Sequence, residues 1–270
     1  MSVITISRGS FSGGKLLAEC LAGRLGYRCV DRDVIVKRAA AQGVSEEELA
    51  DALMKPPGFL DRFHHRKYLY LTLIQAALAE EVKEGRVVYH GNAGHLLLAG
   101  GGPVLRVRII APMDFRIRMC VERLKLSESS AAAYIRKVDS DRKRWTQYLY
   151  GVDWQDPSLY DIVINLENVG IPEACSLVAS MVEAQKCFDF GPKCRQAMEN
   201  LALASRAKAA LALDPATAHL EFTVTADRST VHVKGRIGAV ELIDDVRRVL
   251  HTVPGVEEIG LEELAAATPD

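Results

Sequence analysis

A glycine-rich segment near the start of the chain most constrains its fold. Gly9-Ser10-Phe11-Ser12-Gly13-Gly14-Lys15 lies between a β-branched run at residues 3–6 and an apolar, helix-prone run at residues 16–22. This order, with the spacing G-x-x-x-x-G-K, is typical of a phosphate-binding loop between a strand and a helix. Glycines leave backbone N–H groups open to an anion, the helix N-terminus attracts negative charge, and lysine adds a mobile cation. We therefore interpret residues 9–15 as a phosphate-binding loop rather than a structural turn.

The position after Lys15 departs from the usual pattern. Ser or Thr, whose hydroxyl ligates Mg²⁺, normally follows the lysine, whereas this chain has Leu16 and Leu17. Two alternatives stay open: the metal is held through water and substrate phosphates, which Mg²⁺ tolerates, or catalysis is weak or absent. We expect no metal site made of protein side chains, and we expect both leucines to pack the helix against the sheet.

Composition and charge exclude several classes of protein. With 49% hydrophobic and 26% charged residues, the chain is typical of a globular protein with a substantial core. A formal net charge of -1 argues against a general nucleic-acid binder, which would carry a broad basic excess. No apolar run approaches the roughly 20 residues of a membrane span, and no export signal is visible at the N-terminus. These features predict a cytoplasmic protein.

Six cysteines are scattered along the chain without the paired spacing of a metal site. They are Cys20, Cys29, Cys120, Cys175, Cys187 and Cys194. Several lie in apolar helix or strand contexts, which favours buried free thiols in a reducing compartment over a disulfide framework. Cys187 and Cys194, near the predicted domain junction, are the one pair to watch.

Short apolar segments alternate with longer helical patterns over the first 185 residues. The predicted strands are residues 3–7, 29–31, 86–90, 105–110 and 161–166. The predicted helices are residues 15–25, 33–41, 66–84, 114–126, 129–143 and 171–185. This alternation implies βαβ crossovers and a parallel sheet.

The pattern changes after residue 185. An alanine-rich helix is predicted first, then two strands, an amphipathic helix and a last strand. These elements are expected at residues 193–213, 220–226, 230–234, 239–252 and 256–261. This αββαβ order is compact enough for a unit of its own. We therefore predict two domains, residues 1–190 and residues 191–270, and expect the second to be removable from the first.

Candidate binding side chains follow the predicted strands. Asp31 and Arg32 end the second strand, and Asn92 follows the third, at the edge where parallel sheets bind ligands. Asp33 is interpreted either as the cap of the next helix or as a substrate contact. His95 is another hydrogen-bonding candidate, with helix packing as its alternative role.

Three arginines follow the fourth predicted strand. Arg116 lies on the next helix, and Arg136 and Arg142 belong to a basic segment that ends in aromatic residues at 145–154. Phosphoryl transfer needs clustered cations and a closing element, and a lid would lie between strands four and five. A solvated charged face is the alternative interpretation of residues 136–144.

With these residues, the chain resembles the cytidylate-kinase-like family of P-loop nucleoside monophosphate kinase folds, over residues 1 to about 185. The resemblance is carried, besides the loop, by Ser7-Arg8, Gly26-Tyr27, Val88-Tyr89-His90-Gly91, Ala111-Pro112, Lys137-Val138-Asp139 and Leu159-Tyr160-Asp161. It implies an α/β fold with a five-stranded parallel sheet in 2-3-1-4-5 order and a helical lid.

The resemblance also implies roles for individual residues. Residues 9–15 would hold the phosphates of ATP, and Arg136 and Arg142 would be lid arginines that act with Lys15 in catalysis. Asp31 and Arg116 would face the acceptor. Asn92 stands where cytidylate kinases have an arginine that binds the acceptor.

Residues 216–264 resemble a BON domain, through Val231-His232-Val233-Lys234-Gly235 and Val253-Pro254-Gly255-Val256. Such modules are associated with binding rather than catalysis. The C-terminal unit is therefore expected to bind a ligand, a membrane surface or another protein, and self-association of the chain stays open.

Two functions follow from the sequence. The first is ATP-dependent phosphoryl transfer, with Mg²⁺ bridging phosphates and a nucleoside monophosphate as acceptor. The second is a nucleotide-binding regulator, weak or inactive as an enzyme, that signals through the C-terminal unit. Lys15, Arg136 and Arg142 favour the enzyme, whereas Leu16, Leu17 and Asn92 favour the regulator.

Overall fold

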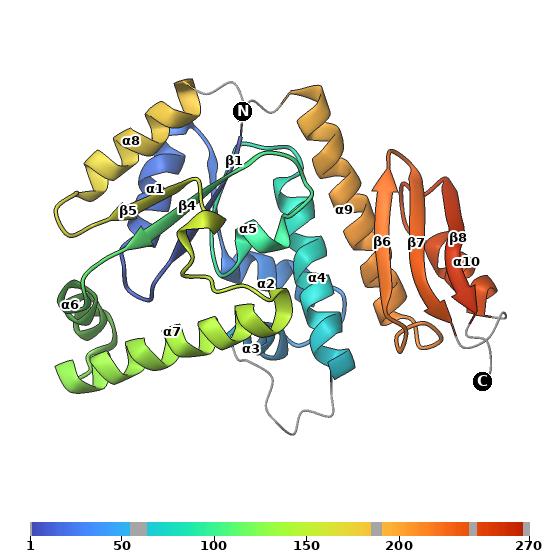
Figure 1. Cartoon of the computed structure of the whole chain (residues 1–270), viewed down its shortest axis with the longest axis horizontal. Coiled ribbons are helices and arrows are strands. Elements are labelled where there is room, and N and C mark those ends of the chain that lie inside the picture. The colour runs from blue at the N-terminus through green and yellow to red at the C-terminus, as the bar shows by residue number, and fades with distance from the viewer. Residues whose placement is uncertain (1, 55–63, 185–190, 238–241, 267–270) are drawn as a thin grey trace.

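The computed structural model describes residues 2–54, 64–184, 191–237 and 242–266. Two β-sheets organise this part of the chain, a larger parallel sheet and a smaller mixed one, with a long helix between them (Figure 1). Within the described residues, no helix combines the length and the apolar character needed to cross a bilayer.

The larger sheet has five parallel strands in the order β2-β3-β1-β4-β5, as predicted. The strands are β1 (Val3–Arg8), β2 (Arg28–Asp31), β3 (Val87–His90), β4 (Val104–Ile110) and β5 (Ile162–Asn165). All five pair in parallel, and Ile6 of β1 lies beside His90 of β3. The carboxyl ends of β1, β2 and β3 therefore meet at one edge, which is where ligands bind in sheets of this kind.

Helices cover both faces of this sheet. They are α1 (Gly14–Leu25), α2 (Arg32–Ala40), α3 (Glu46–Met54), α4 (His64–Val82), α5 (Gly94–Leu97), α6 (Met113–Leu124), α7 (Glu128–Tyr150) and α8 (Ile171–Ala184). Helices α1 and α8 pack side by side on one face, where Leu17 and Val178 share a core with Ile4. Helices α2 to α5 bury the other face around Ile35, Leu78 and other apolar side chains.

Helix α7 is longer than predicted, because it continues past residue 143 to Tyr150. The reason is packing: Trp145 is fully buried in the core beside α3, and its Nε1 donates a hydrogen bond to Ala52 O at 2.7 Å. Of the aromatic residues predicted to end a lid, Trp145 anchors the helix in the core, whereas Tyr148 is exposed. The N-terminal part of α7 packs against α6 through Ala131, Ile135 and Cys120. We call α6 and this part of α7 the lid.

The smaller sheet forms the C-terminal unit. After α9 (Pro192–Leu213) come β6 (Phe222–Asp227), β7 (Thr230–Ile237), α10 (Leu242–Leu250) and β8 (Glu258–Ala266). Strands β6 and β7 are antiparallel, whereas β7 and β8 are parallel. Val246 and Leu250 of α10 pack on Val231 and Val233 of β7. The αββαβ order is the one that the sequence predicts.

Helix α9 contributes to the cores of both parts of the molecule. Met198 and Ala202 are buried with α4 and its neighbours, whereas Leu203 and Leu211 are buried against the smaller sheet. A helix that is apolar on two faces is a buried helix, and its alanines allow close approach. Gly101 shows how close: a Cβ there would lie 2.8 Å from Met198 Sδ. The predicted division at residues 190 and 191 therefore falls just before a shared helix.

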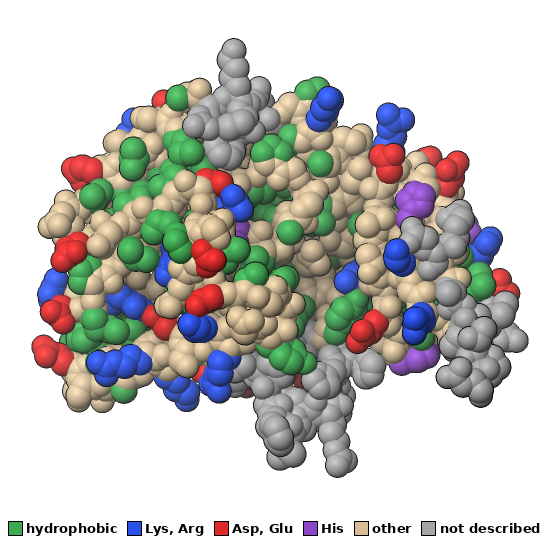
Figure 2. All heavy atoms as spheres, viewed as in Figure 1, with side chains coloured by type: hydrophobic (Ala, Val, Ile, Leu, Met, Phe, Trp, Pro, Cys, Tyr) green, Lys and Arg blue, Asp and Glu red, His purple; other side chains and the backbone are tan. Residues whose placement is uncertain are grey.

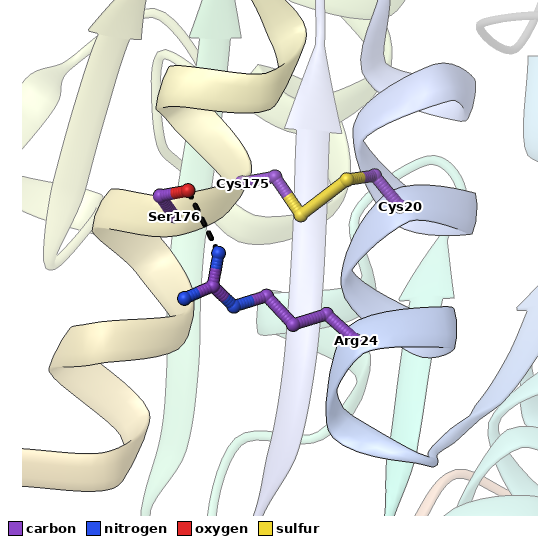
Figure 3. The surroundings of a disulfide bond; sticks show 4 residues. All are labelled: Cys20, Arg24, Cys175 and Ser176. Atoms are coloured by element: carbon purple, nitrogen blue, oxygen red, sulfur yellow. Dashed lines mark hydrogen bonds between the residues drawn. A yellow bond between two sulfur atoms is a disulfide. The ribbon is translucent and has the colours of Figure 1, made fainter.

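A disulfide joins Cys20 of α1 to Cys175 of α8, with the two Cα atoms 6.2 Å apart (Figure 3). Beside it, Arg24 Nη1 donates a hydrogen bond to Ser176 Oγ at 2.7 Å. The expectation of free thiols alone is wrong for this pair, because two helices that are distant in sequence lie side by side on one sheet face. Cys29 and Cys120 are free thiols, Cys194 is buried, and Cys187 lies outside the described residues.

We expect Cys20→Ser to lower the Tm of oxidised protein by several degrees, since a cross-link over so long a loop contributes about 2–4 kcal/mol. Calorimetry with and without dithiothreitol, together with thiol counting by mass spectrometry, measures this effect. The exposed Cys29→Ser variant is the matched control. A wild-type Tm that does not respond to reductant would contradict the cross-link.

Candidate active site

A cleft of about 510 Å³ opens at the edge where β1, β2 and β3 end. The phosphate-binding loop and the ends of β2 and β3 form one side of it, and the lid forms the other. Its lining residues are Arg8, Ser10, Phe11, Gly13, Gly14, Lys15, Leu16, Asp31, Arg32, Asp33, His90, Gly91, Asn92, Met119, Arg123, Leu124, Tyr134, Val138 and Arg142. Most of the residues predicted for the loop and for acceptor binding therefore line this one cleft.

The phosphate-binding loop has a backbone that needs glycine. Gly13 has φ 85°, in the left-handed region, and caps the N-terminus of α1. At Gly9 an added Cβ would lie 2.8 Å from Ser12 Oγ, which donates a hydrogen bond to Gly9 O. The loop closes on itself in this way and leads Gly14 directly into α1. The first N–H groups of that helix have no partners within the helix and are suited to bind an anion.

Lys15 and Leu16 both line the cleft. Lys15 is 53% exposed, and its Nζ lies 3.6 Å from Glu19 Oε1, an exposed pair of the kind that contributes little energy. The lysine is therefore able to leave Glu19 for an anion. Leu16 is 47% exposed, whereas Leu17 is fully buried in the core. The expectation that both leucines pack against the sheet is thus confirmed for Leu17 and wrong for Leu16.

Arg116, on the lid helix α6, contacts the phosphate-binding loop and Asp139 of α7. Its Nε donates a hydrogen bond to Ser10 O at 2.7 Å, and its Nη2 lies 2.5 Å from Asp139 Oδ2. Asp139 Oδ1 accepts hydrogen bonds from both Ser10 N and Ser10 Oγ, each at 3.2 Å. Arg116 and Asp139 are largely buried. Together they hold the lid helices against the first half of the loop, and Arg116 is not among the residues that line the cleft.

Arg142 faces the interior of the site. Its Nη1 donates a hydrogen bond to Arg8 O, at the end of β1, and its guanidinium lies 5.4 Å from the centre of the Trp154 ring. Burial lowers the pKa of Arg142 to about 10, so the side chain remains charged at neutral pH. The Nε atom of Arg142 is buried without a hydrogen-bond partner among the described residues. Arg142 thus brings a desolvated positive charge to the cleft.

Arg136 lies on a different face of the same helix. Successive residues of an α-helix are about 100° apart, so positions separated by six residues diverge by about 120°. Tyr134, Val138 and Arg142, four residues apart, share the face that lines the cleft, whereas Arg136 is exposed. Figure 2 shows Lys and Arg side chains along the α7 edge of the molecule. The solvated-face interpretation fits Arg136, and the structure does not bring it together with Arg142.

Asp31 and Arg32 border the cleft at the end of β2. Asp31 Oδ1 accepts a hydrogen bond from Val34 N at 2.9 Å, so Asp31, rather than Asp33, caps α2. Arg32 pairs with Asp33 at 2.9 Å. Asp31 and Asp33 thus both contact residues at the start of α2.

Asn92 and His95 follow β3. Asn92 lines the cleft, but its Nδ2 donates a hydrogen bond to Leu53 O at 2.9 Å and fastens α3. His95 is buried against the Tyr160 ring, 4.8 Å away between centroids, and burial lowers its pKa to about 4. Of the two alternatives for His95, helix packing is confirmed. Within the described residues, no three His, Cys, Asp or Glu side chains are placed to hold a metal ion.

The sequence-based candidates omitted Arg8 and His90. Both line the cleft, and Arg8 Nη1 lies 3.3 Å from His90 Nδ1. The available signal was position: Arg8 is the last residue of β1 before the loop, and His90 is the last residue of the neighbouring β3.

We expect Arg142→Ala to reduce the turnover of nucleotide substrates at least tenfold. The substitution removes a desolvated cation whose electrostatic contacts are strongest in the transition state, where charge is redistributed. Arg136→Ala on the exposed face of α7 is expected to change turnover less than twofold. A coupled kinetic assay of the two variants checks this difference. Equal losses in both variants would show that the two arginines act together in a lid position other than the one described.

The fold and the cleft together define a class of protein. A five-stranded parallel sheet in this order, with a glycine-rich loop between β1 and α1, is a P-loop kinase fold. The model of the cytidylate kinase-like family matches residues 3–168. The chain belongs to the cytidylate kinase-like family.

Individual relatives agree with this assignment. The chain is 27% identical over 187 residues to the cytidylate kinase of Staphylothermus marinus, covering 68% of this chain and 97% of that protein. It is 29% identical over 177 residues to the cytidylate kinase of Ignicoccus hospitalis, covering 64% and 94%. The crystal structure of an uncharacterized protein from Eubacterium ventriosum has the same fold, with a TM-score of 0.54 and 18% identity over 68% of this chain and 99% of that one. The family match ends before α8 and the C-terminal unit.

Proposed function

We propose that the chain transfers the γ-phosphoryl group of ATP to a nucleoside monophosphate. The observation that carries the proposal is one cleft lined by the phosphate-binding loop, Lys15 and Arg142 together with Asp31 and Asn92, which would form its acceptor edge. Donor and acceptor bound in such a hollow would bring their phosphates together, and this reaction depends mainly on positioning and charge stabilisation. The relatives named as cytidylate kinases support the same reaction.

The reaction needs no nucleophilic side chain. An oxygen of the acceptor's phosphate attacks the γ-phosphorus of ATP, the bond from that phosphorus to the β–γ bridging oxygen breaks, and ADP leaves with the electron pair. Lys15 would stabilise the β- and γ-phosphates. Arg142 would offset the charge on the group in transfer from the lid side. Arg116 and Asp139 would hold the lid closed on the loop.

Mg²⁺ would be held in this site mainly by the phosphates of ATP and by water. The position after Lys15, where a hydroxyl ligand usually stands, is Leu16, which borders the cleft and offers no oxygen. The cleft does hold two carboxylates, Asp31 and Asp33, and Mg²⁺ commonly keeps several waters beside one or two such groups. When bound, the ion supplies charge neutralisation for the phosphates.

The test begins with isothermal titration of ATP into the full chain. A coupled assay of ADP release with CMP, UMP, AMP and GMP as acceptors then defines the substrate. We expect release that depends on one or two of these acceptors. Tight ATP binding with no release above the rate of slow ATP hydrolysis would contradict phosphoryl transfer.

That second outcome would favour a nucleotide-binding regulator. The specific observation on its side is the exposed apolar side chain of Leu16 at the place of the metal-binding hydroxyl. A regulator of this kind would pass its nucleotide state through α9 to the C-terminal unit. Hydrogen exchange in β6 and β7 that responds to ATP would support it.

We also propose that the C-terminal unit is a BON-like binding domain. Its αββαβ order and its own core around Val231 and Leu250 support this. Helix α9 is the first helix of this unit and also belongs to the larger core, so the two units share it. A first domain that folds alone would therefore end after Leu213 rather than at residue 190. Such a unit would bind a ligand, a membrane surface or another protein, and whether the chain associates with itself is decided by analytical ultracentrifugation.

A further inference from the structure

Arg8 is a half-buried cation at the end of β1. Within the described part of the chain, no carboxylate lies within ion-pair distance of its guanidinium, whereas two other cleft-lining cations, Lys15 and Arg32, pair with Glu19 and Asp33. Buried charges are normally paired. The surroundings of Arg8 therefore leave a place for an anion.

The side chain of Arg8 lies directly over the start of α1. A Cβ added at Gly14 would lie 2.3 Å from Arg8 Cδ and 3.0 Å from Arg8 Cβ, so only glycine leaves room for this arrangement. The aliphatic part of Arg8 thus crosses the start of α1, and the guanidinium extends beyond it to His90 at the end of β3. A guanidinium in this position attracts a phosphate group beside the one that the helix N-terminus attracts.

His90 holds the guanidinium in place as a neutral acceptor. It is buried at the end of β3, and burial and the Arg8 charge lower its pKa to about 4. The neutral imidazole accepts a hydrogen bond from Arg8 Nη1 through Nδ1, at 3.3 Å. This contact satisfies one donor of Arg8 without neutralising its charge, so the guanidinium keeps its affinity for an anion.

The neighbours of Arg8 identify which phosphate it faces. Lys15 lies beyond Gly14, at the donor end of the loop. Arg8 Nη1 instead reaches His90 at the end of β3, and Asp31 and Arg32 at the end of β2 line the same cleft. In the strand order β2-β3-β1, this is the acceptor side of the cleft.

We infer that Arg8, positioned by His90, forms a subsite for the phosphate group of the acceptor nucleotide. The inference rests on the proposed phosphoryl transfer, and it assigns the acceptor's phosphate to a residue of β1 that precedes the phosphate-binding loop. Arg142 approaches from the lid: its Nη1 donates to the backbone O of Arg8, and both arginines line the cleft. The two arginines would hold the phosphate between donor and acceptor, where Asn92 offers no charge.

Titration calorimetry of the full chain with the four nucleoside monophosphates, the four unphosphorylated nucleosides and a non-hydrolysable ATP analogue tests the subsite. We expect Arg8→Met to weaken binding of the preferred monophosphate by about 10- to 100-fold, the loss typical of one charge-assisted hydrogen bond. The matching nucleoside should bind wild type and variant equally, and the affinity for the ATP analogue should change less than threefold. Arg118→Met, an exposed arginine on α6, is the matched control.

Three further variants keep the test decisive if Arg8→Met folds poorly. Arg8→Lys retains the charge without the planar fork and is expected to lose part of the monophosphate affinity. His90→Phe removes the acceptor of the Arg8 hydrogen bond and should raise the acceptor's KM more than it lowers kcat. His90→Asn, with an amide oxygen near the place of Nδ1, should restore the KM.

The outcomes separate this inference from the proposed function. Equal loss of nucleoside and monophosphate binding in Arg8→Met, or a larger loss for the ATP analogue, would overturn the acceptor subsite. Wild-type protein that binds no monophosphate more tightly than its nucleoside would overturn it as well. Phosphate-dependent binding through Arg8 without any transfer from ATP would leave the subsite standing and contradict the reaction.

Discussion

Replacing Lys15 by alanine is expected to weaken ATP binding by about 10- to 100-fold and to lower turnover further, because the charge-assisted contact to a phosphate is worth roughly 1.5–3 kcal/mol. Among the residues that the structure describes, the exposed Glu19 is the one ion-pair partner of Lys15, which lines the cleft beside Gly14. The fold should be unaffected, since the side chain is half exposed and alanine favours the helix. Titration calorimetry and a coupled kinetic assay measure the two effects.

Lys37→Ala is the matched control, because Lys37 is an exposed lysine on α2. Its ATP affinity and turnover should equal those of the wild type. If Lys15→Ala also binds ATP normally and turns over at the normal rate, then residues 9–15 form a structural turn and the interpretation as a phosphate-binding loop is wrong.

A chain that ends at residue 190 is expected to be unstable, whereas a chain that ends at residue 214 should fold and bind ATP. The shorter chain lacks α9, and with it Met198, which is fully buried in the larger core. Truncation of one buried Met side chain alone costs about 2–5 kcal/mol, a large share of the 5–15 kcal/mol that stabilises a typical domain. It also lacks the ion pair of Arg206 with Glu80, at 2.7 Å.

Thermal unfolding, followed by circular dichroism, compares the two truncated chains with the full one. We expect a Tm near that of the full chain for residues 1–214 and a strongly lowered Tm or aggregation for residues 1–190. A stable, ATP-binding chain of residues 1–190 would show that the division predicted from the sequence pattern is the better one. It would also show that α9 belongs to the C-terminal unit alone.

The large sheet was predictable because its signals are local. Apolar β-branched runs such as the one at residues 3–6 alternate with helical patterns, and each strand was located within one or two residues. Alternation alone predicts a parallel sheet, whereas the order 2-3-1-4-5 came from the family resemblance. The glycine spacing of the loop likewise indicates its own backbone conformation, as Gly13 shows.

The errors concern how elements meet in space. Sequence spacing could not show that Cys20 and Cys175 lie on adjacent helices. It also could not show that Trp145 is buried against α3, which extends α7. The lid arginines illustrate the same limit, since Arg136 and Arg142 look equivalent in a basic run until the helix places them on different faces.

The sequence predicted many residues of the candidate site but not the contacts between them. Most of the loop, together with Asp31, Arg32, Asn92 and Arg142, does border one cleft. The contacts of Arg116 with Ser10 and Asp139, and those of Arg8 with His90, depend on tertiary neighbours that the sequence does not display. Their roles in binding and catalysis stay predictions until the variants are measured.

Transfer of labelled phosphate tests the central claim most directly. The full chain is mixed with ATP labelled at the γ-phosphate, Mg²⁺ and the monophosphate that binds best, and the products are separated over time. We predict that the label appears in the nucleoside diphosphate in step with ADP, and that Lys15→Ala abolishes most of this transfer. Label that appears only as inorganic phosphate, or that remains in ATP, would contradict phosphoryl transfer to a nucleotide.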